Sequence, residues 1–409
     1  MYFPRKRKFW SVAIGHLTND IFMASGTILL TYLSGTILPM SNTQIGLAVG
    51  VKNFAGALTQ PFFGLRADKT GGRGIGAGGL AWVVVMYMVA LLAAIYTGNY
   101  WLMFIPFVLQ GFGSAALHPV GALHATESES ERAATATAYF FLMGQVGLAF
   151  GPVLVGALLT LTTIEYGGWV GFPAGDGFQT NFSPIFLMGL FAIPVIILMF
   201  TGIPANREND DSGEFVKEKV KVDQKQKISW KPFIVIAVMV LFRSLGQPGS
   251  VDFIPLLFQQ KGWTPAEYGA IVSSFWIASA IMGVVFGNLA DRFDRRLVVM
   301  LSLVLSAPAF FFLPVLDGYG AFALSIIAGG LSGGSHSIIV VLAQELIPDS
   351  KGFATGAILG FIFGSGALGS IAIGMVSDAV GLSLTFQMVA VTIFISGLLG
   401  LLLPKRAAG

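Results

Sequence analysis

The chain of 409 residues is 55% hydrophobic and only 11% charged, with a mean hydropathy of +0.77 and a formal net charge of +3. Soluble globular domains carry roughly 25% charged residues, so this composition excludes an ordinary soluble protein and indicates a bundle of helices in lipid. The sequence has no cysteine, which excludes disulfides, thiol catalysis and thiolate metal sites.

The apolar segments predict twelve membrane-spanning helices, since a helix of about 20 mostly apolar residues crosses the hydrocarbon core. The basic residues 5–8 resemble the start of a signal peptide, but the apolar segment behind them is too long and no small-residue cleavage site closes it. We therefore expect the first span there. The spans are expected at 10–33, 44–65, 75–97, 100–122, 133–161, 184–203, 232–258, 265–288, 297–316, 319–346, 352–377 and 383–403.

The distribution of lysine and arginine predicts the orientation, because cytoplasmic loops carry an excess of both. With the N-terminus inside, the cytoplasmic segments contain 21 of the 24 basic residues, and the external loops contain only Lys261. The other two, Lys52 and Arg243, lie within predicted spans. We expect a multi-pass protein of the plasma or inner membrane with both termini in the cytoplasm.

A repeated loop divides the chain into two halves. The segment 64–73 (GLRADKTGGR) corresponds to 287–296 (GNLADRFDRR), and each copy lies between two predicted spans. We expect a six-helix bundle over 1–203 and a second one over 232–409. The hydrophilic segment 204–231 mixes acids with lysines, and we expect a solvated cytoplasmic loop there rather than an amphipathic helix.

The two sets of six helices and the doubled loop resemble the major facilitator superfamily over essentially the whole chain. That resemblance implies an all-α membrane fold of two pseudo-symmetric bundles, which rock around a central substrate site. It also implies a cytoplasmic latch that breaks during the transport cycle; the alternative is that the loop charges only set the topology. The latch residues are Gly64, Asp68, Arg73, Gly287, Asp291 and Arg292.

A second pattern lies in the fifth span, where residues 147–156 read GLAFGPVLVG. It is similar to a glycine–proline pattern of the drug–proton antiporters of this superfamily, with Val155 in place of one glycine. Generic helix packing is the alternative, because small residues make a flat face and proline permits a bend. In the fourth span these antiporters carry a buried arginine where this chain has Phe107, so a role for that arginine is not carried over. The residues of the pattern are Gly147, Gly151, Pro152 and Gly156.

Short stretches in four places resemble the fosmidomycin-resistance subgroup of efflux proteins. Their order and placement imply an exporter driven by protons, although the substrate need not be that antibiotic. The stretches are 16–20 (HLTND), 60–61 (QP), 113–119 (GSAALHP), and 343–345 (AQE) together with 352–356 (GFATG).

Two charged residues lie near the middle of predicted spans. Superposing the halves places Asp20 opposite Arg243, and a rise of about 1.5 Å per residue puts each close to the midplane of the bilayer. A charge at that depth costs about 2.5–3.5 kcal/mol on insertion scales, so neither is expected to face lipid. We expect the two to meet in a water-accessible chamber between the halves. The alternative is a static pair that holds the halves together.

We expect Asp20 to be the main proton-coupling group, with His16 one helical turn before it on the same face. His118 and His336 occupy equivalent places in the two halves and are further candidates, because histidine titrates near neutral pH. The alternative is that both only bond a neighbouring backbone. We predict no metal site, since two histidines on separate helices are weak evidence for one.

The predicted substrate-binding residues are Arg243, Asn19, Asp20, Gln247 and Asp252. Arg243 suits a carboxylate or phosphonate, because its planar fork donates two parallel hydrogen bonds. The stretch around Gln247 (SLGQPGS) is expected to break its helix and free backbone groups for a ligand, or to form only a mechanical kink. Asp252 is expected near the outer surface, as a gate residue or a solvated helix end.

The sequence as a whole predicts a secondary transporter rather than an enzyme, with the proton gradient and no cofactor as its energy source. The glycine-rich run 71–79 follows a span rather than a strand, and no Walker-type motif indicates ATP. We expect proton-coupled efflux of a drug-like or anionic organic compound; the alternative is a proton-coupled uptake symporter for an organic anion or sugar. The expected partners are the small-molecule substrate and the lipid bilayer, with no nucleic acid, and the chain is expected to be monomeric.

Overall fold

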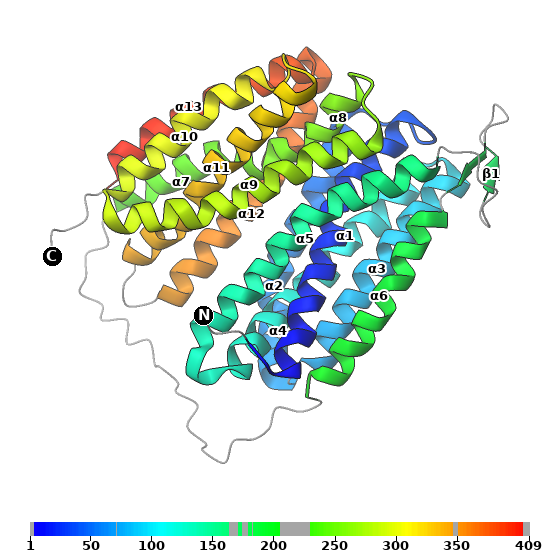
Figure 1. Cartoon of the computed structure of the whole chain (residues 1–409), viewed down its shortest axis with the longest axis horizontal. Helices are drawn as coiled ribbons and strands as arrows, with labels where there is room; N and C mark the ends of the chain where they lie inside the picture. The colour runs from blue at the N-terminus through cyan, green and yellow to red at the C-terminus, as the bar shows by residue number, and fades with distance from the viewer. Residues whose placement is uncertain are drawn as a thin grey trace.

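The fold is that of a helical membrane protein, shown as a computed structural model in Figure 1. The predicted central loop 204–231 lies almost entirely outside the described residues, so the expectation of a solvated tether stays a prediction. The structure describes residues 4–70, 72–162, 171–173, 179–181, 183–204, 230–346 and 351–403.

Six long helices make up the first half of the chain. They are α1 (Arg7–Gly35), α2 (Asn42–Thr70), α3 (Arg73–Thr97), α4 (Tyr100–Ser128), α5 (Ala133–Thr162) and α6 (Ser183–Gly202). A 3-10 turn, η1 (Ser130–Arg132), precedes α5. Between α5 and α6 two short strands, β1 (Gly171–Pro173) and β2 (Gln179–Asn181), pair antiparallel.

The second half also crosses six times, and its first crossing is broken. α7 (Trp230–Ser244) continues through η2 (Leu245–Ser250) and η3 (Val251–Phe253) into α8 (Ile254–Gln259). Gln247 leaves helical geometry, with φ −143° and ψ 118°, directly before Pro248, so the break lies where the sequence predicts it. The remaining elements are α9 (Pro265–Arg292), α10 (Arg295–Phe312), α11 (Gly318–Leu346), α12 (Lys351–Val380), α13 (Leu382–Leu399) and η5 (Gly400–Leu402).

The predicted twelve crossings are present, although only ten of them, within the described residues, are apolar enough by themselves to qualify as membrane spans. α1 and α2 are long enough, at 29 residues each, and fall short because of their polar residues. Most of α1 is buried inside the bundle, where His16, Asn19 and Asp20 contact protein. Polar groups are tolerated in a spanning helix when they face the bundle interior.

Capping side chains explain where several helices begin. Asn99 accepts hydrogen bonds from the backbone N–H groups of Trp101 and Leu102 at the start of α4. Asp294 accepts one from the N–H of Arg296 at the start of α10. These N–H groups belong to the first helical turn and have no partner within the helix, so a polar side chain there sets the first residue of the helix.

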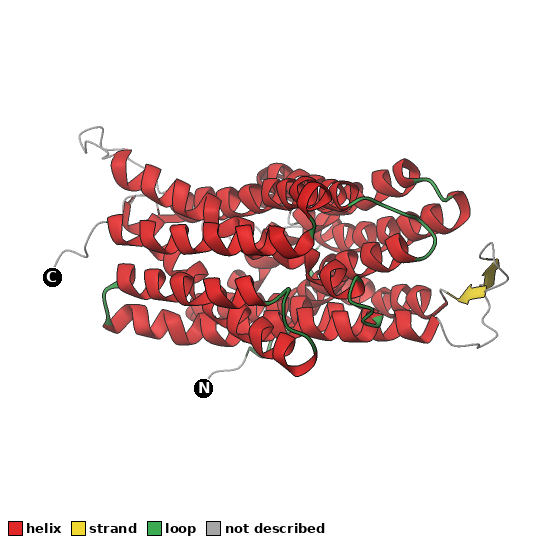
Figure 2. Cartoon of the chain, turned by 90° about the horizontal axis from the view of Figure 1, so that it is seen from above, coloured by secondary structure: helices red, strands yellow, loops and turns green. Residues whose placement is uncertain are grey.

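The two bundles meet along two pairs of helices, α2 with α12 and α5 with α9. A Cβ atom at Gly46 of α2 would collide with the carbonyl oxygen of Ser370 in α12, and one at Gly269 of α9 would collide with that of Pro152 in α5. Gly46 and Gly269 lie near the starts of α2 and α9, toward the end of the molecule that bears β1 and β2, which we call the far end. The opposite end, where α1 begins and α13 ends, is the terminal end (Figures 1 and 2). In Figure 1 the bundles separate toward the terminal end.

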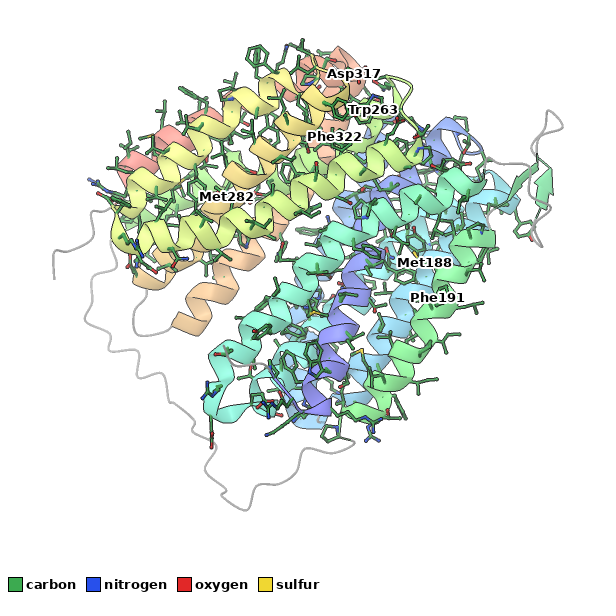
Figure 3. The ribbon with its side chains drawn as sticks, in the orientation of Figure 1. Met188, Phe191, Trp263, Met282, Asp317 and Phe322 are labelled. Carbon is green, nitrogen blue, oxygen red and sulfur yellow. The ribbon has the colours of Figure 1, made fainter. Side chains whose placement is uncertain are left out.

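An aromatic cluster ties together two far-end loops of the second bundle (Figure 3). Trp263, between α8 and α9, donates its Nε1–H to Oδ1 of Asp317 at 2.7 Å and stacks on Phe322 of α11, with 5.6 Å between ring centroids. The N–H of Gly318 also donates to Asp317, and these two donors hold the pKa of this carboxyl below its usual value. Asp317 therefore connects elements of one bundle only.

Glycines let some helices approach until backbone meets backbone. A Cβ atom at Gly79 of α3 would lie 2.6 Å from the carbonyl oxygen of Gly113 in α4, and one at Gly113 would lie 2.5 Å from that of Gly79. By contrast, nothing lies within 4 Å of a Cβ atom at the adjacent Gly78. The contact between α3 and α4 thus depends on two facing glycines, as is common between helices in membranes.

We expect Gly79→Ala to destabilise the protein by about 1–3 kcal/mol, because the added methyl group pushes α3 and α4 apart. Gly78→Ala is the matched control, since it adds the same methyl group one position away in open space. Thermal unfolding of the two purified variants in detergent measures the difference. Equal melting temperatures would contradict this account of the packing.

Candidate functional site

Asp20 lies at the centre of a buried polar cluster in the first bundle. Its Oδ2 lies 3.3 Å from Nε2 of His16, one turn earlier in α1, and its Oδ1 lies 3.7 Å from Nε2 of His118 in α4. The side chain of Asn19 donates to Oδ1 of Asp20 at 2.7 Å and to Oγ of Ser114 at 3.1 Å. Asp20 is only 7% exposed, so protein groups rather than water determine its electrostatic environment.

Both histidines of the cluster direct the same ring nitrogen at the carboxylate. Nδ1 of His16 lies 2.9 Å from the carbonyl oxygen of Phe140, and Nδ1 of His118 lies 2.8 Å from that of Ser114. A carbonyl oxygen only accepts, so each Nδ1 carries the hydrogen and each Nε2 of a neutral ring is an acceptor. Two acceptor nitrogens therefore face a carboxylate, and this arrangement is stable only when a proton or another cation lies among them.

Glycine in α5 makes room for this cluster. A Cβ atom at Gly144 would lie 2.6 Å from Nε2 of His16 and 2.8 Å from Oδ2 of Asp20. Sequence reasoning did not single out this residue, although it extends the predicted pattern to 144, 147 and 151. The ring of His16 stacks on Phe140 with 4.2 Å between ring centroids, so α5 both limits and orients the histidine.

The glycine–proline pattern of α5 contributes to two different contacts. Cβ atoms at Gly147 and Gly151 would collide with the backbone of α1, at Leu17 and Ile21 on either side of Asp20. Gly156 instead faces the first residues of α9, and the carbonyl of Pro152 faces Gly269 of the same helix. One end of the pattern therefore supports the Asp20 cluster and the other end joins the two bundles.

Arg243 forms a second buried network, in the opposite bundle. It is 2% exposed. Nε donates to Oγ of Ser335 at 2.7 Å, and Nη2 donates to Oε1 of Gln247 at 3.1 Å and to the carbonyl of Ser332 at 3.3 Å. Nη1 donates to the carbonyl of Gln247 at 3.3 Å, and the side chain of Gln247 in turn donates to Oγ of Ser279 at 3.1 Å. The backbone group that the broken helix frees thus binds Arg243.

The expected meeting of Asp20 and Arg243 is not present. No ion pair joins them, and among the described residues Arg243 has only neutral hydrogen-bond partners. The physical reason is that each charged group finds its nearest polar neighbours inside its own bundle: Asn19 and two histidines for Asp20, and serines and Gln247 for Arg243. Superposition of the halves predicts matching depth, and it does not predict which neighbour a side chain chooses.

The two predicted histidines at equivalent positions lie in different surroundings. His118 joins Asp20 and His16, and its ring lies edge-on to that of His16 at 4.8 Å between centroids. His336 follows Ser335 in α11, so it lies beside the Arg243 network and apart from the Asp20 cluster. Three of the four predicted proton-coupling residues are therefore together in the first bundle.

Two further charged residues, Lys52 and Asp252, belong to opposite bundles and lie close enough to interact electrostatically. Asp252, in η3, accepts a hydrogen bond from Oγ of Ser370 in α12 at 2.7 Å. Its carboxylate is therefore bound to the protein and is not surrounded by water alone. Lys52 of α2 is 2% exposed; its Nζ donates to the carbonyl of Met23 at 3.2 Å and lies 4.9 Å from the centre of the Phe107 ring. A buried cation therefore lies beside Phe107, and it comes from α2 rather than α4.

The first copy of the predicted latch is partly outside the described residues. The side chain of Asp68 belongs to that undescribed part. Arg73 donates from Nε to the carbonyl of Ile203 at 2.6 Å, which ties the start of α3 to the end of α6. A Cβ atom at Gly64 would be in ordinary contact with Pro119, 3.4 Å away.

The second copy of the latch lies at the end of α9, which contains Gly287 and Arg292. Asp291 lies 3.8 Å from Nη2 of Arg295, and Arg295 also pairs with Glu345 of α11. Each described ion pair of this copy stays inside the second bundle. The role of both copies as a latch between bundles therefore stays a prediction.

Comparison with known proteins identifies the family. Residues 12–264 and 251–408 match the sequence profile of the Major Facilitator Superfamily. The chain belongs to this superfamily. It is therefore a multi-pass cell membrane protein with the fold of a transporter, as its sequence predicts.

Two relatives in sequence and one solved structure of the same fold match nearly the whole chain. The fosmidomycin resistance protein of Escherichia coli (strain K12) is 24% identical over 97% of this chain and 92% of its own. The uncharacterized MFS-type transporter YfnC of Bacillus subtilis (strain 168) is 25% identical over 96% of this chain and 92% of its own. A bacterial homolog of the human lysosomal transporter Spinster, solved in an inward-facing and unoccupied conformation, superposes with a TM-score of 0.77 over 97% and 96% of the two chains at 16% identity.

The Asp20 cluster also has the composition of a cation site. One ligand atom from each of His16, Asp20 and His118 lies within 4.8 Å of the others. Imidazole and carboxylate groups bind divalent metals as well as protons. The prediction that the transporter has no metal site therefore stays a prediction, which measurements with and without a chelator test directly.

We expect neutral His16 and His118 to carry hydrogen on Nδ1, because each Nδ1 faces a carbonyl oxygen. The chain has four histidines, so ¹⁵N NMR of histidine-labelled protein in detergent resolves them individually. Gly144→Ala should shift the signals of His16, whose ring the new methyl group displaces, and leave those of His124 unchanged. Neutral rings protonated on Nε2 at both His16 and His118 would contradict the assignment.

Proposed function

We propose that the transporter exports a drug-like organic compound in exchange for protons. The observation that carries this proposal is the convergence of His16 and His118 on Asp20. Two imidazole lone pairs and a carboxylate repel one another unless a proton lies among them, so the cluster is suited to bind and release a proton. In this proposal the proton gradient replaces any cofactor, and the monomer is the working unit.

The position of the cluster links proton binding to helix movement. Its groups come from α1 and α4, and the carbonyl of Phe140 on α5 holds the ring of His16. α5 also contacts α9 across the interface. A change in the contact between bundles therefore alters the surroundings of the proton, which is the requirement for coupling its release to alternating access.

We infer that Arg243 binds a negatively charged group of the substrate. It is buried, and among the described residues its hydrogen-bond partners are all neutral. A buried cation without a counter-ion is costly, so an anion that reaches it gains a strong interaction. Four of the five guanidinium N–H groups are used, which leaves one on Nη1 for a ligand.

Charge balance provides the argument for the alternative, proton-coupled uptake. An anion near Arg243 favours a proton on the Asp20 cluster, and two ligands that favour each other are carried together. Export by antiport requires instead that the substrate and the proton exclude each other. This happens, for example, when a polar group of the substrate takes the place of the proton beside Asp20. Two features support export: the resistance named for the Escherichia coli relative, and the separation of Arg243 from Asp20, which weakens the mutual attraction.

The separation of the bundles at the terminal end suits one step of this cycle. The positive residues predict a cytoplasmic location for that end. In the proposed cycle the described arrangement is then the inward-facing state, in which an exporter collects its substrate. Rocking about the substrate site would next open the far end.

Uptake of radiolabelled fosmidomycin, a phosphonate, into proteoliposomes tests the proposal. An exporter accumulates the compound when the lumen is acidic, whereas a symporter accumulates it only when the gradient is reversed. This sign does not depend on how the protein is inserted, because it follows from the coupling reaction itself. We expect accumulation with an acidic lumen, and accumulation only with an alkaline lumen would contradict export.

In the same vesicles Asp20→Asn should abolish accumulation driven by the pH gradient, because the amide cannot bind and release the proton. Exchange of labelled for unlabelled compound without a gradient should persist, which shows that the variant is folded. Asp317→Asn removes a carboxylate from a far-end loop and is the control. Full gradient-driven accumulation by Asp20→Asn would refute the assigned role, and a chelator in all buffers excludes a metal effect.

Arg243→Gln should weaken fosmidomycin binding in either direction of transport. A charge-assisted hydrogen bond contributes about 1.5–3 kcal/mol, so the half-saturation concentration should rise roughly 10-fold to 150-fold. Ser335→Ala, which removes one neutral partner of Arg243, should cause a much smaller change. An unchanged half-saturation concentration in Arg243→Gln would show that the anion binds elsewhere.

A further inference from the structure

We propose that two reciprocal helix caps hold the far end of the transporter closed. Together they form a far-end latch, which is distinct from the predicted cytoplasmic latch. In each cap, a side chain near the end of a helix in one bundle accepts hydrogen bonds from the first turn of a helix in the other. Asp378 of α12 caps α2, and Thr160 of α5 caps α9. This latch concerns the closure of the far end and is independent of the proposed substrate and proton sites.

The Asp378 cap crosses from the second bundle to the first. Oδ1 accepts from the N–H of Asn42 at 2.8 Å, and Oδ2 accepts from the N–H of Thr43 at 2.8 Å. These are the first two residues of α2, whose N–H groups have no partner inside the helix. A carboxylate at this place also interacts favourably with the positive end of the helix dipole.

The Thr160 cap crosses in the opposite direction. Its Oγ1 accepts from the N–H of Ala266 at 3.0 Å, in the first turn of α9. A hydroxyl is neutral and here serves one N–H group, whereas the Asp378 carboxylate is charged and serves two. Charge-assisted hydrogen bonds are roughly twice as strong as neutral ones, so the latch is asymmetric and the Asp378 side is the stronger.

The two caps are related by the internal repeat. Their targets, Thr43 and Ala266, are separated by the same distance along the sequence as the two copies of the repeated loop. The capping residues, Thr160 and Asp378, are separated by the same distance as the equivalent histidines, His118 and His336. A single accidental contact would have no counterpart at the equivalent place of the other half. The equivalence therefore indicates that both caps descend from one feature of the duplicated unit.

The rest of each helix start follows the same plan. Ser41 and Gln44 exchange hydrogen bonds before α2, at 2.9 and 3.1 Å. Thr264 and Glu267, which stand at the equivalent positions of the second half, do so before α9, at 2.7 and 3.4 Å. In each helix, local side chains thus bind part of the first turn, and the opposite bundle binds the remaining N–H groups.

Paired glycines bring the capping side chains within reach. A Cβ atom at Gly156 would collide with the carbonyl of Pro265 at the start of α9, and one at Gly374 would lie 2.5 Å from that of Asn42 at the start of α2. These glycines stand four residues before Thr160 and Asp378, one helical turn away on the same face. Both caps can form only while the bundles touch at the far end, so opening that end breaks both.

The absence of cysteine in the chain allows a direct test by thiol labelling. Ser273→Cys is the reporter, because Ser273 is 4% exposed and its Oγ accepts from the N–H of Val153 at 3.0 Å across α5 and α9. We expect it to react when the far end opens, because opening separates α5 from α9 at this contact. The rate of its reaction with N-ethylmaleimide is measured in purified full-length transporter in detergent, with no substrate or pH gradient.

In this background Asp378→Ala should raise the labelling rate roughly tenfold or more, because two charge-assisted hydrogen bonds are lost. Asp378→Asn should raise it less. Asp317→Asn is the matched control, since it removes a far-end carboxylate whose contacts stay in one bundle, and it should leave the rate unchanged. In a separate background, Tyr319→Cys places the thiol at a position that is 96% exposed, and it should react at the same rate in every variant.

Thr160→Asp is expected to have the opposite effect. It therefore distinguishes loss of the caps from a general loosening of the fold, which could only raise the labelling rate. It replaces the neutral cap with a charged one, like that of the other half, and should lower the labelling rate of the reporter. Each variant is first required to elute as the parent does in size-exclusion chromatography. A rate within twofold of the parent in Asp378→Ala, or no decrease in Thr160→Asp, would overturn the latch. Because no transport is measured, this result is independent of the fate of the proposed function.

Discussion

A carboxylate faced by two imidazole nitrogens that are both acceptors is the constraint on which the rest of the first bundle depends. Asp20 can hold this position only because α5 approaches α1 through Gly144, Gly147 and Gly151, which leave no room for a side chain. The polar residues of this cluster also make α1 too polar to qualify as an ordinary span, so other helices have to enclose it. The cluster therefore explains both the glycine face of α5 and the buried position of α1. In the proposed function a proton resolves the repulsion, and the surrounding helices determine when it can leave.

Much of the fold could be predicted from the sequence, and the site could be predicted only in part. The twelve crossings, the two halves and the break before Pro248 follow from hydropathy, the repeated loop and proline chemistry, all of which act locally. The pairing of His16 with Asp20 also follows, because residues four apart share a helix face. The pairing of Asp20 with Arg243 was wrong for this conformation. Equal depth in the membrane does not specify rotation about the helix axis, nor whether Ser335 and Gln247 satisfy the guanidinium first.

The duplicated halves share their closely packed glycine positions and differ in their buried polar residues. Gly46 and Gly269 make equivalent contacts, as do Gly156 and Gly374, because any side chain there would hold the bundles apart. The functional positions have diverged instead: Asp20 corresponds to Arg243, and the two equivalent histidines lie in different networks. A close backbone contact tolerates one residue type, whereas a buried polar position tolerates any group that finds partners. In the proposed function, duplication thus led to a proton site in one half and an anion site in the other.

The separation of these two sites constrains how they can communicate. Every described partner of Asp20 lies in the first bundle, and every described partner of Arg243 lies in the second. Rocking of the bundles can therefore leave both networks intact, and neither has to break for the far end to open. What changes during rocking is the contact between bundles, along α2 with α12 and α5 with α9. α5 takes part in both the Asp20 cluster and the contact between bundles, since Gly144 faces His16 and Gly156 faces α9. The most direct physical connection between the proposed proton site and the contact between the bundles therefore runs along α5, from the imidazole ring to the interface.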